Sequence, residues 1–151
     1  MFLAQDYIDH DMLILHGDLV FSQNLAADML TSPVPNCAPL NRICCLSEKD
    51  FKGRLADGKL LEVSVRIFDE GCLAFQPFYK LEKAAASTWI GKVTQFVVDS
   101  HTKCYAENAL NEILPALDVS AFYSDDYFVE KIDTIEDFNR VAKAIQYYDS
   151  K

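Results

Sequence analysis

The sequence predicts an α/β fold, a three-layer domain in which helices pack on both faces of a mixed β-sheet. Short apolar runs bounded by turn residues alternate with longer segments whose apolar residues recur at helical spacing. Hairpin patterns lie between these segments and add antiparallel strands. With 151 residues, the chain has the length of one domain and can bury a sizeable core. We therefore expect a single domain over residues 1–151.

The composition argues against several classes of function. Hydrophobic residues make up 50% of the chain and charged residues 25%, which is typical of a folded globular domain. The net charge of −9, with lysines and arginines scattered, disfavours a protein that binds nucleic acid or an anionic membrane surface. No apolar run approaches the roughly 20 residues needed to span a bilayer. Met1–His10 is too polar for a signal sequence.

The five cysteines form an odd set without the spacing of a metal site. Cys44 and Cys45 are adjacent within an apolar run, and we expect all five side chains to be small buried hydrophobic groups. An odd number of cysteines without a signal peptide favours a reducing compartment. We therefore expect a cytoplasmic protein.

The first third of the chain predicts a helix, a strand, a second helix and a second strand. Apolar residues at helical spacing indicate a short helix in Met1–Asp9. The apolar run Met12–Leu15 predicts a strand buried on both faces, as in a parallel sheet. A capped helix follows over Gln23–Leu30. The run Cys37–Leu46 predicts a strand, and Pro39 indicates an edge or irregular position because proline donates no backbone hydrogen bond.

The middle of the chain predicts a β-hairpin. Its arms are Phe51–Leu55 and Leu60–Phe68, on either side of an Asp57-Gly58 turn. The second arm alternates apolar and polar residues, as a strand with one buried face does. Cys72–Phe75 predicts a further short strand.

The remaining sequence predicts helices followed by strands and a final helix. Leu81–Leu117 is helical in pattern, with a break near His101–Cys104. Val119–Tyr123 and Tyr127–Ile132 predict the last strands. Thr134 begins a T-I-E-D capping box, which predicts the start of a final amphipathic helix.

Two aspartates, Asp18 and Asp133, each follow an apolar strand. Ligands in open α/β sheets collect at the carboxyl ends of strands, so these two side chains could meet at one edge of the sheet. Mg²⁺ typically takes one or two carboxylates, with phosphate oxygens and water completing its coordination. The alternative is that Asp18 only forms a turn and Asp133 only neighbours a helix cap, because aspartate is common in turns.

Two motifs carry a family resemblance. The segment Leu15–Phe21, L-H-G-D-L-V-F, resembles the central "N-G-D-hydrophobic" segment of the sugar-phosphate nucleotidyltransferases. The segment Val129–Phe138, V-E-K-I-D-T-I-E-D-F, is similar to their late "E-I-D-T-x-E-D-L" segment. The order and separation of the motifs also fit, and the choline-phosphate cytidylyltransferase-like branch is the most similar. The resemblance covers nearly the whole chain.

The resemblance implies a Rossmann-like nucleotidyltransferase fold and a specific reaction. Such enzymes join an NTP, here CTP by preference, to a phosphorylated small molecule and release pyrophosphate. Phosphocholine or a sugar phosphate would be the acceptor. Asp18 and Asp133 would be the catalytic carboxylates that bind Mg²⁺. The acceptor oxygen would attack the α-phosphate in line, helped by positioning and by the charge of the metal ion.

The chain departs from the family in its glycines. The family opens with a strand and a G-x-G-x-R loop that holds the NTP phosphates through backbone N–H groups. The five glycines here form no such cluster. We therefore expect an N-terminally truncated domain, the C-terminal portion of the enzyme, that is inactive alone.

A truncated domain would leave sheet edges open. We expect such a chain to form a homodimer or to bind a complementing N-terminal polypeptide. The competing hypothesis is a non-catalytic remnant or interaction domain that keeps the fold to bind a protein partner.

Four further residues are candidates for substrate binding. Lys131 lies where the family often has the glutamate of its "E-I-D", and both Lys131 and Lys52 could contact a phosphate. Tyr105 and Glu107 resemble the "Y-x-E" that precedes the last strands of the family. The alternatives are solvated lysines and ordinary helix packing. His16 is expected to be a core histidine or to support the neighbouring aspartate.

Aromatic residues could also surround a choline-like cation through cation–π contacts. The candidates are Phe75, Phe78, Tyr79 and Trp89. The alternative is that they form the hydrophobic core.

Overall fold

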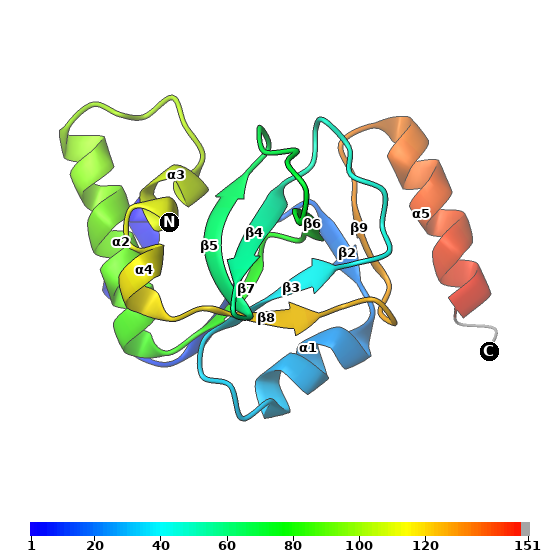
Figure 1. Cartoon of the computed structure of the whole chain (residues 1–151), viewed down its shortest axis with the longest axis horizontal. Coiled ribbons are helices and arrows are strands. Elements are labelled where there is room, and N and C mark those ends of the chain that lie inside the picture. The colour runs from blue at the N-terminus through cyan, green and yellow to red at the C-terminus, as the bar shows by residue number, and fades with distance from the viewer. Residues whose placement is uncertain (149–151) are drawn as a thin grey trace.

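A computed structural model describes residues 1–148 of the chain (Figure 1). The helical elements are η1 (Phe2–Tyr7, a 3₁₀ helix), α1 (Gln23–Thr31), α2 (Lys83–Val98), α3 (Ala106–Asn111), α4 (Leu114–Leu117) and α5 (Ile135–Tyr148). The strands are β1 (Met12–Leu15), β2 (Leu19–Phe21), β3 (Cys37–Asn41), β4 (Lys52–Ala56), β5 (Lys59–Ser64), β6 (Leu73–Phe75), β7 (Phe78–Leu81), β8 (Ser120–Tyr123) and β9 (Val129–Lys131).

The main sheet is mixed and strongly curved. Its strand order is β1-β7-β3-β6-β4-β5-β8, and β8 also pairs with β3, so the second half of the sheet curls back on itself. The β3–β8 pair is parallel and the other pairs of this sheet are antiparallel. A separate antiparallel ribbon joins β2 to β9. The predicted α/β class with a mixed sheet is confirmed.

Alternating side chains of β3 and β7 face two helical layers. Ala38, Leu40, Tyr79 and Leu81 belong to the core cluster that α2, α3 and α4 complete. The intervening residues Cys37 and Phe78 pack with Leu25 and Met29 of α1. This two-residue alternation places α1 on the opposite face of the sheet from α2–α4, as the three-layer prediction requires.

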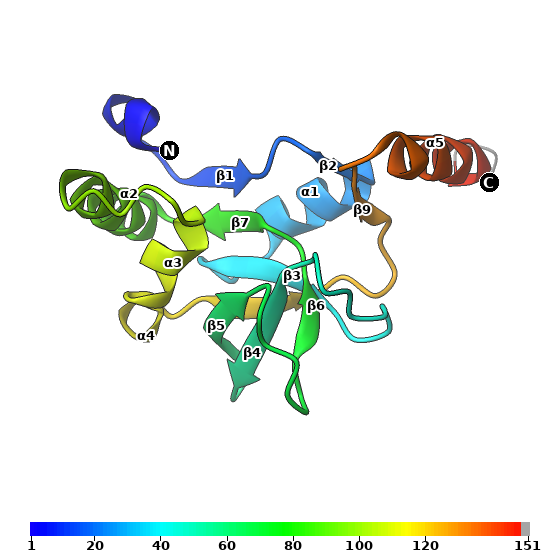
Figure 2. The same cartoon turned by 90° about the horizontal axis from the view of Figure 1, so that it is seen from above.

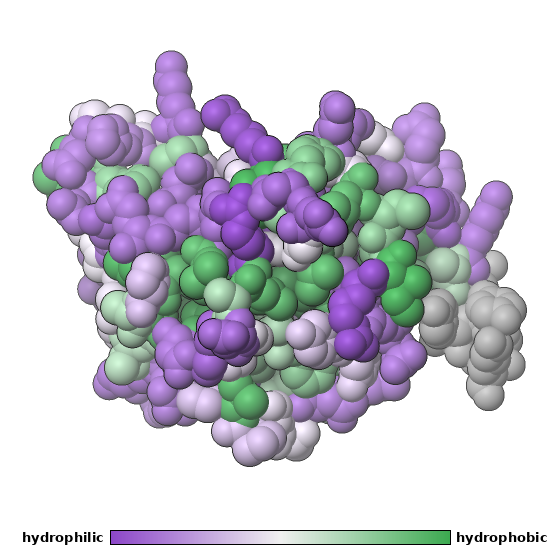
Figure 3. Space-filling model, viewed as in Figure 1, coloured by the Kyte–Doolittle hydropathy of each residue, from purple (hydrophilic) through white to green (hydrophobic). Residues whose placement is uncertain are grey.

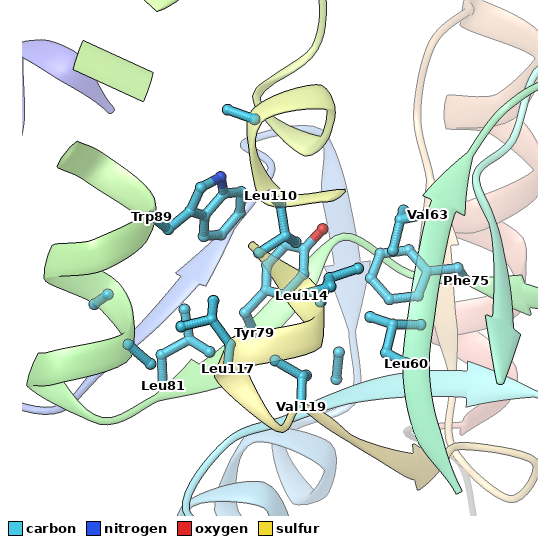
Figure 4. Close-up of a cluster of buried hydrophobic side chains, with 14 of the residues drawn as sticks. Leu60, Val63, Phe75, Tyr79, Leu81, Trp89, Leu110, Leu114, Leu117 and Val119 are labelled. Atoms are coloured by element: carbon cyan, nitrogen blue, oxygen red, sulfur yellow. The ribbon is translucent and has the colours of Figure 1, made fainter. Parts of the chain in front are cut away.

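The larger core cluster is centred on aromatic side chains (Figure 4). Trp89 and Tyr79 are almost fully buried, with ring centroids 4.8 Å apart in an edge-to-face arrangement. The indole nitrogen of Trp89 donates a hydrogen bond to the carbonyl of Ala106 at 3.0 Å, so no polar atom of this ring is left unpaired. Burial of each large side chain contributes roughly 1.5–3 kcal/mol. All four aromatic candidates for a choline-binding wall are buried core residues instead: Phe75, Phe78, Tyr79 and Trp89.

The predicted hairpin is present, but its second strand ends at Ser64 instead of Phe68. β4 and β5 pair in antiparallel register from Lys52↔Ser64 to Ala56↔Lys59. Asp57 and Gly58 form the turn with φ angles of 50° and 76°. Positive φ at both central residues matches the right-handed twist of the arms, and glycine adopts it without strain.

The predicted position of the first strand is wrong. β1 is antiparallel to β7 and lies at the end of the sheet (Figure 2). Its first three residues are only partly buried and Leu15 is 40% exposed, so it is not a strand buried on both faces of a parallel sheet. The backbone N–H of His16 donates to Pro77 O at 3.0 Å, and hydrogen-bonded pairs alternate along an antiparallel ladder. This register directs the backbone groups of Leu13 and Leu15 away from β7. Within residues 1–148, no strand pairs with this side of β1.

Pro39 predicts an edge or an irregular position. β3 is central, so the edge alternative is wrong and the irregular position is the one observed. Proline is tolerated there because its neighbour changes at this point from β7 to β6. Cys37 pairs with Lys80 of β7, whereas Leu40 pairs with Phe75 of β6. The carbonyl of Pro39 accepts a hydrogen bond from the backbone of Gln76, in the turn between those strands. At this change of neighbouring strand, no backbone N–H donor is needed from Pro39.

The cysteine prediction is partly wrong. Cys37 and Cys72 are buried, but Cys44, Cys45 and Cys104 are exposed, and all five are free thiols. Cys44 and Cys45 belong to the loop after β3, which ends at Asn41 instead of continuing to Leu46.

Apolar side chains also remain on the surface. Figure 3 shows apolar surface over the strands at the centre of the view, with hydrophilic residues above and below it. Leu61 and Phe68 are 44% and 50% exposed. At the two ends of the chain, Leu3 and Phe138 are 89% and 54% exposed. Among the described residues, no helix has the length and apolar character to cross a membrane.

Candidate functional site

The structure brings Asp18 and Asp133 together with Lys131. The β2–β9 ribbon pairs Leu19 with Lys131, and the backbone N–H of Ile132 donates to the carbonyl of Asp18 at 2.9 Å. These contacts place the residue before β2 beside the residues that follow β9. The two aspartates therefore meet, but not at the carboxyl ends of two strands of one sheet as predicted. The antiparallel β2–β9 ribbon brings them together.

The ammonium of Lys131 contacts both carboxylates. Its Nζ atom lies 2.9 Å and 3.0 Å from the two carboxylate oxygens of Asp133 and 3.5 Å from Oδ2 of Asp18. Burial disfavours the charged form, but hydrogen bonds and charge from Asp133 and Asp18 prevail and raise the pKa of Lys131 above its usual value. The other carboxylate oxygen of Asp18 is buried and has no hydrogen-bond partner among the described residues.

Asp133 is positioned by the start of α5. The predicted capping box is present: the backbone N–H of Asp137 donates to the Thr134 hydroxyl, and the backbone N–H of Thr134 donates to the Asp137 carboxylate, both at 3.1 Å. The backbone N–H of Asp133 donates to the same carboxylate at 3.3 Å. The side chain of Asp133 therefore remains available for Lys131 and for ligands.

A cavity of about 340 Å³ opens beside this cluster. Lys131 and Asp133 line it on one side, and the loop of residues 44–52 lines it on another. Arg140 also lines it and pairs with Glu130 at 2.6 Å and with Asp137 at 3.1 Å. The sequence analysis did not identify Arg140. The i, i+3 spacing of Asp137 and Arg140 on a predicted helix was the available signal.

Lys52 lines the same cavity, but the loop already binds its ammonium. The Nζ atom donates to the carbonyls of Ser47 at 2.9 Å and Val65 at 2.6 Å and lies 3.8 Å from the ring centroid of Phe68. Burial lowers the pKa of Lys52, while Asp50 opposes this change. These contacts indicate that Lys52 fixes the loop that forms one wall of the cavity.

Glu107 lies in a neighbouring buried cluster. Its Oε1 atom accepts hydrogen bonds from Nε2 of His16 and from the hydroxyl of Tyr79, both at 3.0 Å. The hydrogen bond to Glu107 raises the pKa of His16, against the effect of burial and with help from the charges of Glu107 and Asp18. Because His16 precedes the Gly17-Asp18 turn, Glu107 supports the segment that carries Asp18.

Tyr105 is half-exposed and caps α3. Its ring packs edge-to-face on Phe51, with centroids 5.0 Å apart, and Phe51 also contacts the ring of His16 at 5.8 Å. Phe51 lines the cavity and therefore links it to the Glu107 cluster. The six predicted residues thus divide into an aspartate–lysine cluster, the cavity wall with Lys52, and the neighbouring cluster with Tyr105 and Glu107.

The donor set at Asp18 and Asp133 fits a hard divalent cation. No group of three histidine, cysteine or acidic side chains suited to a metal ion occurs in the described part of the chain. Two carboxylates and exogenous oxygens are nevertheless sufficient for Mg²⁺, which keeps several waters or substrate oxygens. The unpartnered buried oxygen of Asp18 supplies one free ligand atom, and Lys131 lies between the two carboxylates.

Comparison with solved structures identifies the fold. No protein-family model and no curated sequence matches the chain. The CTP:phosphocholine cytidylyltransferase of Streptococcus pneumoniae superposes with a TM-score of 0.73 at 14% identity, covering 95% of this chain and 61% of that protein. The inositol-1-phosphate CTP transferase of T. maritima gives 0.69 at 15% identity, with coverages of 90% and 55%. A protein provisionally described as a glucose-1-phosphate thymidylyltransferase from Bacillus anthracis gives 0.69 at 12% identity, with coverages of 92% and 56%.

These similarities define the fold as that of the Rossmann-like nucleotidyltransferases. They confirm the fold that the two sequence motifs imply. The chain spans between 55% and 61% of the length of these three structures.

Proposed function

We propose that this chain is the C-terminal, acceptor-binding portion of a Mg²⁺-dependent nucleotidyltransferase. The complete enzyme would join an NTP, with CTP favoured, to a phosphorylated small molecule such as phosphocholine or a sugar phosphate, and release pyrophosphate. The chain alone would be inactive. Its five free thiols support a cytoplasmic location.

The observation that carries the proposal is the meeting of Asp18 and Asp133 around Lys131, beside a cavity, in a nucleotidyltransferase fold. Among the described residues, the side-chain partner of both aspartates is the flexible Lys131. Asp18 keeps one oxygen without a partner, and Asp133 is 42% exposed at its side chain. These are the properties expected of metal ligands awaiting a substrate.

The cavity suits a small phosphorylated acceptor. Its volume of about 340 Å³ is in the range of pockets that hold small molecules. Lys49, Lys131 and Arg140 line the cavity and are the cations that would contact a phosphate group. Asp50, Glu130, Asp133 and Asp137 also line it, so the phosphate would compete with these carboxylates for the cations. Phe51 and Pro77 provide apolar surface for the remainder of the acceptor.

In this proposal, the residues of the chain position the reactants. Asp18 and Asp133 would hold the metal ion, and Lys131 and Arg140 would attract the acceptor phosphate. A bound Mg²⁺ would neutralise charge on the phosphates and help to align the attacking oxygen. The hydrogen bond between His16 and Glu107 would keep the Asp18 turn in place. No covalent enzyme intermediate is required.

The alternative, a non-catalytic interaction domain, has its own support. The outer backbone groups of β1 form an open edge, and the nearby η1 helix exposes Leu3 and Tyr7 at 89% and 81%. A strand from a second copy, or from a complementing N-terminal polypeptide, would satisfy this edge. The gene upstream of the Met1 codon can be read for a glycine-rich loop. If the loop is encoded there, the hypothesis that this chain is part of an enzyme is favoured.

Thermal unfolding with acceptor candidates tests the proposed function. Phosphocholine, inositol 1-phosphate and glucose 1-phosphate would each be added with Mg²⁺ to the wild type and to Asp18→Asn and Asp133→Asn. At about 100 times the Kd, a bound acceptor stabilises the wild type by about 2.7 kcal/mol and raises Tm by several degrees. We expect at least one acceptor to do so, and neither variant to respond.

Asp126→Asn is the matched control, because Asp126 is exposed and lies outside the cavity lining. It should respond as the wild type does. Stabilisation that survives in Asp18→Asn and Asp133→Asn would contradict the site assignment. The absence of a response to every acceptor would favour the interaction domain.

A further inference from the structure

The position between the two candidate metal ligands is already taken by a positive charge of the chain itself. The Lys131 ammonium lies 2.9 Å from Oδ1 of Asp133 and 3.5 Å from Oδ2 of Asp18. Both distances are within reach of an ion pair, and Lys131 is the cation that both carboxylates share. A metal ion bridging these carboxylates would have to lie close to the same place.

The ribbon fixes this arrangement. Lys131 is directly opposite Leu19 in the β2–β9 ladder, and the neighbouring Ile132 bonds to the backbone of Asp18. Glu130, one residue earlier, instead pairs with Arg140. Successive residues of a strand point to opposite faces, so the register that directs Glu130 to α5 directs Lys131 to the aspartates.

The pairing is also partly shielded from solvent. The side chains of Lys131 and Asp18 are 26% and 35% exposed, so water screens their attraction less than at an open surface. Without Lys131, two carboxylates would face each other with no compensating charge. A lysine is a flexible cation that can leave, and Lys131 lines the adjacent cavity into which its ammonium could move.

We propose that Lys131 is the resident counter-cation of the Asp18–Asp133 pair, and that a divalent metal ion binds there only by displacing its ammonium. This inference rests on the proposed function for the identity of the metal ligands. The chain would thereby regulate its own metal affinity. Without metal, Lys131 neutralises the two carboxylates, and a metal ion must compete with its ammonium to bind. Wild-type protein would consequently bind divalent cations weakly when no phosphate is present.

Mn²⁺ binding, measured by electron paramagnetic resonance of the free ion, tests the inference without any enzymatic turnover. Mn²⁺ substitutes for Mg²⁺ at oxygen sites. Removal of the competing charge in Lys131→Met should tighten Mn²⁺ binding at least tenfold relative to the wild type. Lys131→Gln, which keeps a hydrogen-bond donor but no charge, should do the same. Lys131→Arg should bind Mn²⁺ as weakly as the wild type.

Two comparisons assign the effect to this site. Lys103→Met removes an exposed lysine outside the cavity lining and should leave the Mn²⁺ affinity unchanged. Asp18→Asn in the Lys131→Met background should abolish the gain. In EDTA, the neutral Lys131 variants should melt at a lower temperature than the wild type, and Mn²⁺ should restore more stability to them than to the wild type.

Equal Mn²⁺ affinity in the wild type, Lys131→Met and Lys131→Gln would overturn the inference, as would a gain that persists after Asp18→Asn. If Lys131→Met does not fold in EDTA, the comparison of Lys131→Gln with Lys131→Arg decides. The proposed function can fail independently. In that case acceptor phosphates produce no thermal shift, while the order of Mn²⁺ affinities still holds.

Discussion

At the scale of single residues, the candidate site depends on charges that are balanced in pairs. Lys131 compensates Asp18 and Asp133, Arg140 compensates Glu130 and Asp137, and the ammonium of Lys52 is bound by backbone carbonyls. The Lys131 and Lys52 environments differ in a way that matters for function. Lys131 has carboxylate partners that a metal could take over, whereas the carbonyl partners of Lys52 belong to the cavity loop, at Ser47, and to the segment after β5, at Val65.

We predict that Lys52→Met destabilises the protein although the new side chain has a similar length. It leaves the carbonyls of Ser47 and Val65 without their donor, and the contact with the Phe68 ring is lost. The expected decrease in the free energy of unfolding is about 2 kcal/mol, measured by urea titration. Lys49→Met, at an exposed position of the same loop, is the control and should change it by less than about 0.5 kcal/mol. Equal effects of the two changes would contradict a structural role for Lys52.

Glu107→Ala should be strongly destabilising. Glu107 is 1% exposed and accepts hydrogen bonds from His16 and Tyr79, so its loss leaves the buried Tyr79 hydroxyl without an acceptor. We expect the free energy of unfolding to fall by at least about 2 kcal/mol. Glu112→Ala removes a half-exposed carboxylate paired with Lys92 and should cost less than about 1 kcal/mol. A Glu107→Ala protein as stable as Glu112→Ala would show that the buried cluster is not structural.

At the scale of elements, the strands on either side of Gly53 leave no room for a larger side chain. A Cβ atom at Gly53 would lie 2.7 Å from Leu40 and 3.1 Å from Leu60. Both neighbours are almost fully buried, so neither can move without disturbing the core. Gly53 follows Lys52, which lines the cavity, so this close packing lies next to the cavity wall.

Gly53→Ala and Gly91→Ala should therefore have opposite effects. Overpacking at Gly53 should lower the free energy of unfolding by about 1–3 kcal/mol. At Gly91, within α2, a Cβ atom would meet nothing within 4 Å, and alanine should stabilise the helix by about 0.5–1 kcal/mol. Chemical denaturation of the two variants measures both values. A stabilising Gly53→Ala would mean that the strands separate more easily than the packing indicates.

Local patterns predicted the elements well where local chemistry determines them. The Asp57-Gly58 turn and the Thr134 capping box depend on neighbouring residues alone, and both are present. Strand partners depend on distant residues, which explains the error at β1 and why Pro39 alone did not decide between an edge and an irregular position. The short strand β7 was missed because Phe78–Leu81 runs directly into the helical pattern of α2.

The same limit applies to the site. The two motifs identified Asp18, Lys131 and Asp133, and the structure brings these three together. Sequence alone did not reveal that Lys131 lies between the aspartates, because this depends on the register of β2 against β9. Nor did it reveal that Glu107 bonds to His16, since that contact joins α3 to the turn after β1.

At the scale of the whole molecule, the sheet has one curled half and one open end. β8 contacts both β5 and β3 and so protects the curled half, whereas β1 is open on one side within the described residues. The site lies beside the open end, because the Gly17-Asp18 turn follows β1 directly. In the proposed function, the nucleotide would bind to additional structure at the β1 edge.

We propose that Asp18 and Asp133 hold a divalent metal ion beside the phosphate of an acceptor in the adjacent cavity. The most direct test is the ³¹P NMR linewidth of phosphocholine, inositol 1-phosphate or glucose 1-phosphate with the protein and substoichiometric Mn²⁺. We expect wild-type protein with Mn²⁺ to broaden the signal of at least one acceptor well beyond the broadening by Mn²⁺ in buffer. The double variant Asp18→Asn, Asp133→Asn should abolish this excess. Equal broadening by the wild type and the double variant would contradict the proposal.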